Sequence, residues 1–473
     1  MFIIEAAAAV LAAVSVAPEP IPTLLITGHN NHNWQYTSRV HADTLRATGR
    51  FDVTITDDPA RTLADGAALG AYRLFVLDYN DIHEPRRWGD AAERNFIAAV
   101  EGGVGVAAIH AANNSFPGWK DYERMLGLMW RDGTGHGRVH EFGVEFVDRD
   151  HPITKGMAEF TTRDELYHDL VNSQNARYSL LARAMSTSES GGSGKHEPMA
   201  FTLSFGKGRV FATPLGHVWV NAEDTKSSIT TPGFRTLLVR GAEWAATGAV
   251  TLPAEWRDTR THNTLSPEEK AAGWRLLFDG ESTAGWRAYR RPALPDNTGW
   301  SVTHSELAYA PGRAGGDIMT AAQFGDFELS TEFKVSPGGN SGIIYRVTED
   351  HDYPWQTGPE FQILDDLRHG DKAKATTRTG SFYDVFGCAF DTGRPAGEWN
   401  HARIVCRGGR IEHWLNGFKV VDVDLASEEY KAAHARSKWT RMPAFATRAR
   451  GHIALQDHGD PVWFRNIKVR SLD

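Results

Sequence analysis

The hydrophobic pattern of this chain changes near Trp274, and that change constrains the fold more than any single motif. Before it, continuous apolar runs at residues 23–27 and 73–78 alternate with segments of helical spacing such as residues 90–100. After it, short alternating runs such as residues 327–335 follow one another between Gly, Pro, Asn and Asp turns. The first pattern is typical of a parallel sheet covered on both faces, and the second of an antiparallel sandwich or jelly roll.

The length agrees with more than one domain, because 473 residues exceed what one ordinary core accommodates. We predict a leader and linker over residues 1–21, an α/β domain over 22–250, a second linker over 251–270 and an all-β domain over 271–473.

The first residues resemble a poor or truncated export signal. Residues 2–16 are apolar except for Glu5 and Ser15, which is the length of a signal-peptide core rather than of a membrane span. A positively charged start is missing, and Pro18 disfavours cleavage nearby. We therefore expect a periplasmic or secreted protein, with the cytoplasm as the alternative, and no membrane span.

The amino-acid composition limits the classes of molecule that this protein is expected to bind. The formal net charge of −8, with no basic run among aromatic residues, argues against nucleic-acid binding. The 15 Trp residues suit the apolar faces of sugars, although Trp is also ordinary core material. The only cysteines, Cys388 and Cys406, could pair or stay free. The oligomeric state is left open.

Polar loops follow the predicted parallel strands at residues 28–34, 78–81 and 110–114. Ligands of such sheets bind beyond the carboxyl ends of the strands, so we expect a polar small-molecule pocket there. The spacing of the histidines matches no standard zinc signature, so the metal is left unknown, and hydrogen-bonding loop histidines are the alternative. The candidate residues of this pocket are His29, His32, Trp34, His110, Asp164, Glu165 and His217.

The third parallel strand ends without a nucleophile. A glutamine amidotransferase of flavodoxin-like fold would carry a cysteine on this strand-to-helix turn, where His110 stands instead. Both cysteines lie in the other half of the chain, so the sequence excludes glutaminase chemistry.

Several short motifs of the first half resemble the ThuA-like (trehalose utilisation) family. They are residues 28–34, 109–112, 151–154, 164–167, 206–210 and 216–217. The resemblance spans about residues 22–249 and implies a flavodoxin-like, amidotransferase-like α/β fold that lacks amidotransferase chemistry. It also implies a link to disaccharide metabolism, with no defined reaction.

In the second half, residues 358–366 are expected to form a strand with an unusual polar face. Alternation places Glu360 and Gln362 on one side and Phe361 with Ile363 on the other. The face indicates a binding groove, while an edge strand that shows its polar side to water is the alternative. A jelly-roll glycosidase would carry a further acid at the position of Leu364, so the single-strand carboxylate pair is missing.

The order of motifs from Trp274 onward resembles the 3-keto-disaccharide hydrolase domain, a concanavalin-like jelly roll. One departure is Asp279, where Asn is common, and Asp serves the same turn. The motifs are residues 276–280, 285–286, 327–333, 340–346, 358–365, 380–383, 398–400, 414–417, 455–459 and 464–467.

The resemblance implies a carbohydrate substrate with a ketone at C3. Such a substrate can lose its C2 proton and then its leaving group by elimination, and water adds afterwards. We expect a base, an enolate stabiliser and an acid, supplied by polar residues that stand within or beside the predicted strands of the matching motifs. The catalytic candidates are Glu360 or His458 as base and Tyr383 or His413 as acid; the substrate-binding candidates are Arg346, Asn340, Gln362, Gln456 and Asp365.

No cofactor is certain from the sequence. A divalent metal is one option for the enolate stabiliser, and no NAD is expected because a Gly-x-Gly-x-x-Gly fingerprint does not follow any strand. The alternatives are a carbohydrate-binding jelly-roll module fused to a ThuA-like domain and an ordinary glycoside hydrolase.

Overall fold

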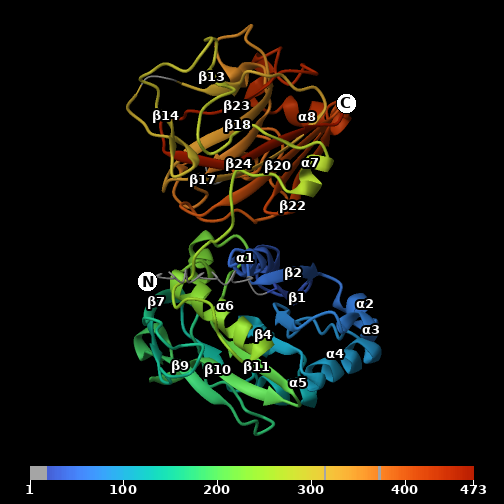
Figure 1. The fold of residues 1–473 in the computed structure, drawn as a ribbon, viewed down its shortest axis with the longest axis vertical. Helices are drawn as coiled ribbons and strands as arrows, with labels where there is room; N and C mark the ends of the chain where they lie inside the picture. The colour runs from blue at the N-terminus through green and yellow to red at the C-terminus, as the bar shows by residue number, and fades with distance from the viewer. Residues whose placement is uncertain (1–18, 314–315, 371–373) are drawn as a thin grey trace, which may run out of the picture.

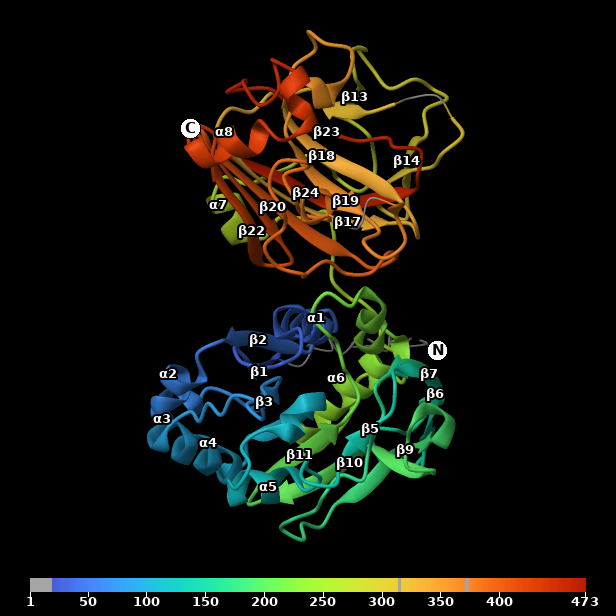
Figure 2. The same cartoon turned by 180° about the vertical axis from the view of Figure 1, so that it is seen from behind.

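The computed structural model describes residues 19–313, 316–370 and 374–473 (Figure 1). The predicted leader therefore lies outside the described residues, apart from residues 19–21. Figures 1 and 2 show two bodies stacked along the long axis and joined by one segment of chain. No helix in the described ranges has both the length and the apolar character that crossing a membrane requires.

A nine-stranded sheet forms the centre of the N-terminal half, in the order β2-β1-β3-β4-β11-β10-β9-β6-β7. Its first five strands run parallel, and the remaining four continue it antiparallel. The strands are β1 (Ile21–Ile26), β2 (Phe51–Thr56), β3 (Leu74–Leu77), β4 (Gly105–Ile109), β6 (His140–Phe146), β7 (Phe160–Asp164), β9 (Ser179–Ser186), β10 (Lys195–Phe205) and β11 (Gly208–Thr213), while β5 (Gly135–His136) and β8 (Tyr167–His168) form a separate pair.

Helices cover both faces of this sheet, as its continuous apolar strands predict. Adjacent residues of β1 show why: Leu24 packs in one core and Leu25 in the other. The Leu25 core is covered by α1 (Trp34–Arg46) and α6 (Pro232–Thr247). The Leu24 core is covered by α2 (Pro59–Ala64), α3 (Gly66–Leu69), α4 (Asp90–Gly102) and α5 (Lys120–Leu126).

Two antiparallel sheets form the C-terminal half. One has the order β14-β15-β24-β17-β20-β21-β22, with β12 beside β24, and the other has the order β13-β16-β23-β18-β19. Apolar residues from both sheets share one core, so the half is a sandwich. The strands are β12 (Arg275–Leu276), β13 (Trp286–Ala288), β14 (Trp300–Thr303), β15 (Glu306–Tyr309), β16 (Ile318–Thr320), β17 (Phe327–Val335), β18 (Asn340–Val347), β19 (Glu360–Leu364), β20 (Asn400–Arg407), β21 (Arg410–Leu415), β22 (Phe418–Asp424), β23 (His452–Leu455) and β24 (Val462–Ser471).

The expected fold class, an α/β flavodoxin-like domain followed by an all-β sandwich, is confirmed. Two short helices lie beside the sandwich sheets: α8 (Glu428–His434), and α7 (Pro267–Ala271), which Ser266 caps. The two cysteines are free thiols.

The linker is packed against both halves. Trp256 donates its indole N–H to the carbonyl of Thr44 at the end of α1 (3.1 Å). Further along, the backbone N–H of Asn263 donates to the side chain of Asn466 in β24 (2.6 Å). The linker therefore fixes the two halves rather than tethering them loosely.

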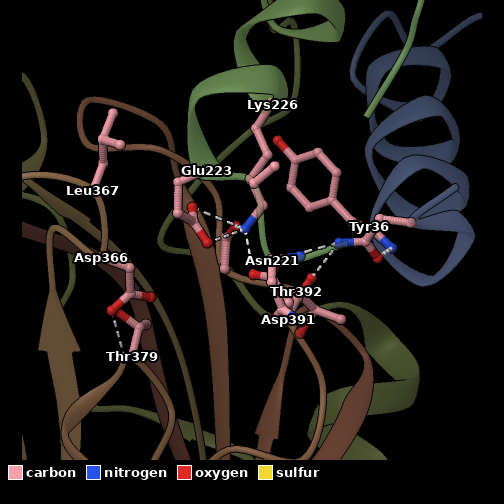
Figure 3. Close-up of polar contacts among 12 residues, drawn as sticks. Tyr36, Asn221, Glu223, Lys226, Asp366, Leu367, Thr379, Asp391 and Thr392 are labelled. Atoms are coloured by element: carbon pink, nitrogen blue, oxygen red, sulfur yellow. Dashed lines mark hydrogen bonds and ion pairs between the residues drawn. The ribbon is translucent and has the colours of Figure 1, made fainter. Parts of the chain in front are cut away.

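Charged side chains connect the halves directly (Figure 3). Lys226, in the 3₁₀ helix η3 (Glu223–Ile229), is fully buried and contacts Glu223 (2.8 Å) and Asp391 of the sandwich (2.6 Å). Burial alone would lower the pKa of Lys226, but the two carboxylates hold its pKa above the ordinary value. Asp391 also accepts from the backbone N–H of Asn221 (3.0 Å) and holds Asn33 through its carbonyl (2.8 Å).

Candidate functional site

A cavity of about 720 Å³ opens on the sandwich at the polar face of β19. Glu360 and Gln362 both line it, whereas Phe361 and Ile363 lie in the core on the opposite side of the strand. The alternation predicted from the sequence therefore holds, and the face is buried rather than open to bulk water, with Glu360 only 4 % exposed. The lining residues are Tyr289, Arg291, Gly316, Asp317, Asn340, Asp352, Tyr353, Pro354, Trp355, Glu360, Gln362, Tyr383, Lys438, Trp439, Arg441, Met442, Gln456, Asp457 and His458.

Glu360 has room because its neighbour on β18 is a glycine. Gly342 pairs with Gln362 across the two strands, and a Cβ at Gly342 would lie 2.2 Å from Oε1 of Glu360. Any side chain at Gly342 would therefore displace the carboxylate. Since φ of Gly342 is not in the left-handed region, the glycine is required for space rather than for backbone conformation.

Two carboxyl groups in this cavity have altered acidity. Burial raises the pKa of Glu360 to about 8, opposed by the Lys438 ammonium and assisted by Asp317. Burial also raises the pKa of Asp317 to about 7, against a hydrogen bond from the backbone N–H of Asp457 (2.8 Å). A carboxyl group with such a pKa can exchange a proton near neutral pH.

Aromatic rings line another part of the cavity. Tyr353 and Trp355 stack with 5.2 Å between ring centroids and 11° between planes, and Trp439 lies 6.1 Å from Trp355. The ammonium of Lys438 lies 4.2 Å from the ring centroid of Tyr383. Flat aromatic surfaces beside hydrogen-bonding groups suit a sugar, which has both apolar faces and hydroxyl groups.

Six of the nine residues predicted for the sandwich site lie together in this cavity: Asn340, Glu360, Gln362, Tyr383, Gln456 and His458. The structure does not bring the other three to it. His413 is fully buried between the hydroxyl of Tyr345 (2.8 Å) and the carbonyl of Gly380 (3.1 Å), and burial lowers its pKa to about 4. It is a hydrogen-bonded core histidine.

Arg346 and Asp365 have structural partners elsewhere. The guanidinium of Arg346 donates to the carbonyl of Gly408 (2.9 Å). The carboxylate of Asp365 accepts from the backbone N–H groups of Gly338 (2.6 Å) and Leu367 (3.0 Å), so it shapes turns beside β19.

Sequence reasoning missed Asp317, Lys438 and Trp439. Asp317 directly precedes β16, and Lys438 and Trp439 stand in the 3₁₀ helix η7 (Lys438–Arg441), far along the chain from β19. Local pattern cannot show that such turns meet one strand. The only available signal was the polar residue Asp317 between a Gly-rich turn and an apolar run.

The N-terminal half places four of its seven predicted residues in one cluster. His32, His110, Glu165 and His217 are all buried, and one side-chain nitrogen or oxygen from each lies within 4.8 Å of the others. Asp164 is not part of this cluster, but its carboxylate accepts from the backbone N–H groups of Gly216 (2.7 Å) and His217 (3.1 Å) and so positions the loop that carries His217.

The other two predicted residues lie outside this cluster. His29 contacts the carbonyl of Glu84 (2.9 Å), and Trp34 begins helix α1 and lines a separate surface hollow with Arg39 and Asp57.

Both halves match known protein families. Residues 273–470 match the 3-keto-alpha-glucoside-1,2-lyase-like domain, and residues 23–245 match the trehalose utilisation family, ThuA. A curated relative, the 3-keto-disaccharide hydrolase of Bacteroides thetaiotaomicron, is 33 % identical over 233 residues, which cover 43 % of this chain and 80 % of the relative.

Solved structures are similar to each half. A protein of Parabacteroides distasonis assigned provisionally to the glycosyl hydrolases is 32 % identical, covers 45 % of this chain and 100 % of its own, and has a TM-score of 0.42. A provisionally named ThuA-like protein of Parabacteroides merdae is 37 % identical, covers 50 % of this chain and 92 % of its own, and has a TM-score of 0.44.

The two family matches cover the sandwich and the α/β half respectively. The protein is carbohydrate-active, and it belongs to the 3-keto-disaccharide hydrolase family through its C-terminal half, which is joined to an N-terminal ThuA domain.

Proposed function

We propose that this protein cleaves the glycosidic bond of 3-keto-glycosides or 3-keto-disaccharides by elimination and hydration. The observation that carries the proposal is the buried carboxyl group of Glu360, whose pKa is raised to about 8, inside a cavity that also holds amide and aromatic side chains. A base of raised pKa is a stronger proton acceptor, which the removal of a carbon-bound proton requires.

The elimination and the later addition of water involve no net oxidation or reduction of the sugar. Glu360 takes the C2 proton, the C2–H electron pair passes into an enolate on the C3 oxygen, and the returning pair expels the C1 oxygen. That oxygen takes a proton from an acid, and an enone remains. Water then adds at C1, and Glu360 returns a proton to C2. Because the substrate already carries the ketone, no nicotinamide is consumed.

The remaining roles are assigned to cavity residues. Asn340 and Gln362 can donate N–H groups to the enolate oxygen, and they lie 3.4 Å apart between Gln362 Nε2 and Asn340 Oδ1. Tyr383, His458 and Asp317 are the candidates for the acid that protonates the leaving oxygen. His413 is not proposed for this role, because it is enclosed by the core.

Ordinary glycoside hydrolysis is a second candidate, supported by one observation. Two carboxyl groups of raised pKa, Glu360 and Asp317, line the same cavity, and standard glycosidases use a carboxyl pair. The two functions differ in whether the ketone is needed and in whether the C2 proton exchanges with solvent.

The test uses the full chain in D₂O with an aryl 3-keto-glucoside and its unoxidised counterpart, followed by NMR. Elimination predicts aglycone release from the keto substrate alone, with deuterium at C2 of the released sugar. Cleavage of the unoxidised glucoside without deuterium would establish ordinary hydrolysis instead. Binding of both compounds without cleavage would leave a carbohydrate-binding module.

The variant Glu360→Gln should abolish cleavage, because an amide cannot accept the proton. Glu428→Gln is the matched control, since its carboxylate is exposed at the start of α8. A parallel assay after chelator treatment tests whether a divalent metal shares the enolate role.

A further inference from the structure

The cluster of His32, His110, Glu165 and His217 is built from four separate loops. His32 follows β1, His110 follows β4, Glu165 follows β7 and His217 follows β11. The imidazole centroids of His32 and His110 are 4.8 Å apart, those of His32 and His217 are 5.1 Å apart, and those of His110 and His217 are 5.3 Å apart. Three of the four loops leave the carboxyl ends of parallel strands, where such sheets bind ligands.

Two of the imidazoles are oriented by a contact at their outer nitrogen. Nδ1 of His32 lies 2.9 Å from Oδ1 of Asn30, and Nδ1 of His110 lies 2.7 Å from the carbonyl oxygen of Pro214. Both partners are acceptors, so each Nδ1 carries the proton and each Nε2 keeps its lone pair. Histidines that bind metals are oriented in this way by an outer oxygen.

His217 is unsatisfied at both nitrogens. It is fully buried, and neither of its ring nitrogens has a hydrogen-bond partner among the residues that the structure describes. Its nearest acidic contact is Oε2 of Glu165, 3.6 Å from Nε2. Leaving a buried polar group without a partner destabilises the folded state, and a bound cation would offset that cost.

The surrounding chain holds this arrangement rigidly. Asp164 fixes the backbone of Gly216 and His217. The hydroxyl of Tyr167 lies 3.0 Å from Nε2 of His110 and donates to its lone pair, so a bound ion would take the place of this hydrogen bond. His110 itself has φ of +46°, a left-handed value that L-residues adopt at a cost.

We propose that His32, His110 and His217, together with Glu165, bind one divalent transition-metal ion of the zinc type. Three imidazole nitrogens and one carboxylate oxygen match zinc and its first-row neighbours, whereas Mg²⁺ and Ca²⁺ prefer oxygen ligands. Zinc–nitrogen distances of about 2.0–2.1 Å place tetrahedral ligands about 3.4 Å apart, so binding draws the ligand atoms, which now lie within 4.8 Å of one another, together by up to about 1.4 Å. The site lies in the ThuA domain and is separate from the sandwich cavity.

The experiment titrates the chelator-treated full chain with Zn²⁺ by calorimetry and with Co²⁺ by visible spectroscopy. We expect one ion per chain and the intense ligand-field bands of low-coordinate Co²⁺. His32→Gln and His217→Ala should each weaken Zn²⁺ binding by more than about 100-fold, the upper range for loss of an outer-shell partner. His151→Ala is the matched control, because that half-buried histidine packs on Trp244 outside the cluster.

Two results would overturn the proposal: no stoichiometric binding by the parent chain, or undiminished binding by both variants. Circular dichroism checks that the variants fold. If they do not, X-ray absorption of the Zn²⁺-loaded parent chain decides, since three-imidazole scattering supports the site and an all-oxygen shell refutes it.

Discussion

Glu360 shows how one side chain depends on its immediate surroundings. The carboxyl group is enclosed by its own strand, by Gly342 opposite and by the Lys438 and Asp317 side of the cavity. Because burial penalises the charged form, the pKa of Glu360 is raised to about 8, and the folded protein keeps this proton until the pH approaches that value. An unfolded glutamate releases it near pH 4.3, so this group makes folding less favourable as pH rises between about 4.3 and 8.

The first prediction concerns the pH dependence of cleavage. If Glu360 is the base, kcat/KM for a 3-keto-glucoside should rise about tenfold per pH unit below pH 8 and level off above it, because only the carboxylate accepts the proton. The variant Asp317→Asn should still show the rise of kcat/KM with pH, because Glu360 is unchanged in it. A midpoint near pH 4 in a pH–rate profile would contradict the assignment.

The second prediction concerns the space beside Glu360. Gly342→Ala should lower kcat/KM by roughly 100-fold while the protein stays folded, because the new Cβ meets the movable end of a side chain 2.2 Å away. Steady-state kinetics and thermal unfolding measure the two effects. Gly143→Ala is the control, since its Cβ meets no atom within 4 Å in strand β6. Unchanged kinetics in Gly342→Ala would show that the position of the carboxylate is not limiting.

At this scale the sequence predicted some roles and not others, for a physical reason. Alternation along one strand placed Glu360 and Gln362 correctly, because side chains change face at every residue. The same rule could not separate His413 from the site, since a buried imidazole that meets Tyr345 has the same pattern as one that meets a ligand. Asp317 comes from a turn, where no period exists to place it.

At the scale of elements, helix α6 shows how a buried charge can fix a helix to two loops. Arg240 is 6 % exposed and donates to four backbone carbonyls, those of Pro152, Ile153 and Lys155 before β7 and that of Leu252 in the linker. These carbonyls have no hydrogen-bond partners in a β-sheet, so the guanidinium supplies the donors that a neighbouring strand would otherwise supply.

The third prediction follows from this contact. Arg240→Leu should lower the free energy of unfolding by about 3–5 kcal/mol, because several buried carbonyls lose their donor at once. Arg240→Lys should recover only part of the lost free energy of unfolding, since an ammonium lacks the planar set of N–H donors that a guanidinium has. Urea unfolding measures the change, and Arg94→Leu on the exposed face of α4 is the control, expected to stay within about 0.5 kcal/mol. Equal stability of Arg240→Leu and Arg94→Leu would refute this role.

Strongly periodic elements were predicted closely and weakly periodic ones were missed. Strand β17 has the bounds of the alternating run 327–335, because a buried face determines where its apolar residues stand. Strand β7 was not predicted: its sequence FTTRD has one apolar residue, and it forms by pairing with β6 at the sheet edge. Tertiary pairing, rather than local preference, determines such strands.

At the scale of the whole molecule, several ion pairs connect the two halves. Besides Lys226 with Asp391, Arg394 pairs with Asp43, and Arg235 pairs with Glu398 (2.5 Å). Asn33, directly after His32, is held by Asp391, so the sandwich contacts the loop that carries one histidine of the proposed metal site. The relative placement of the halves was not predictable, because these pairs join residues more than 150 positions apart.

The fourth prediction tests this connection. Lys226→Met should lower stability by roughly 3 kcal/mol, because Glu223 and Asp391 would remain close together without the ammonium between them. In calorimetry the loss should separate the transitions of the two halves. The exposed Lys431→Met is the control.

Adding Glu223→Gln and Asp391→Asn to Lys226→Met should restore part of the loss, because the two carboxylates, which Arg378 alone would then offset (3.0 and 3.1 Å), are removed. A single transition at the parental midpoint in Lys226→Met would show that this contact does not join the halves.

The ionic character of this contact also bears on how the chain could have arisen. Charged groups hydrate well, so a cut between residues 250 and 270 would expose ion-pairing side chains that water covers easily. Two ancestral proteins with such surfaces could each circulate alone and later be encoded by one gene, with only a few complementary charges to acquire. Engineers could reverse that event and recover the halves as a two-component system that reassembles at low ionic strength.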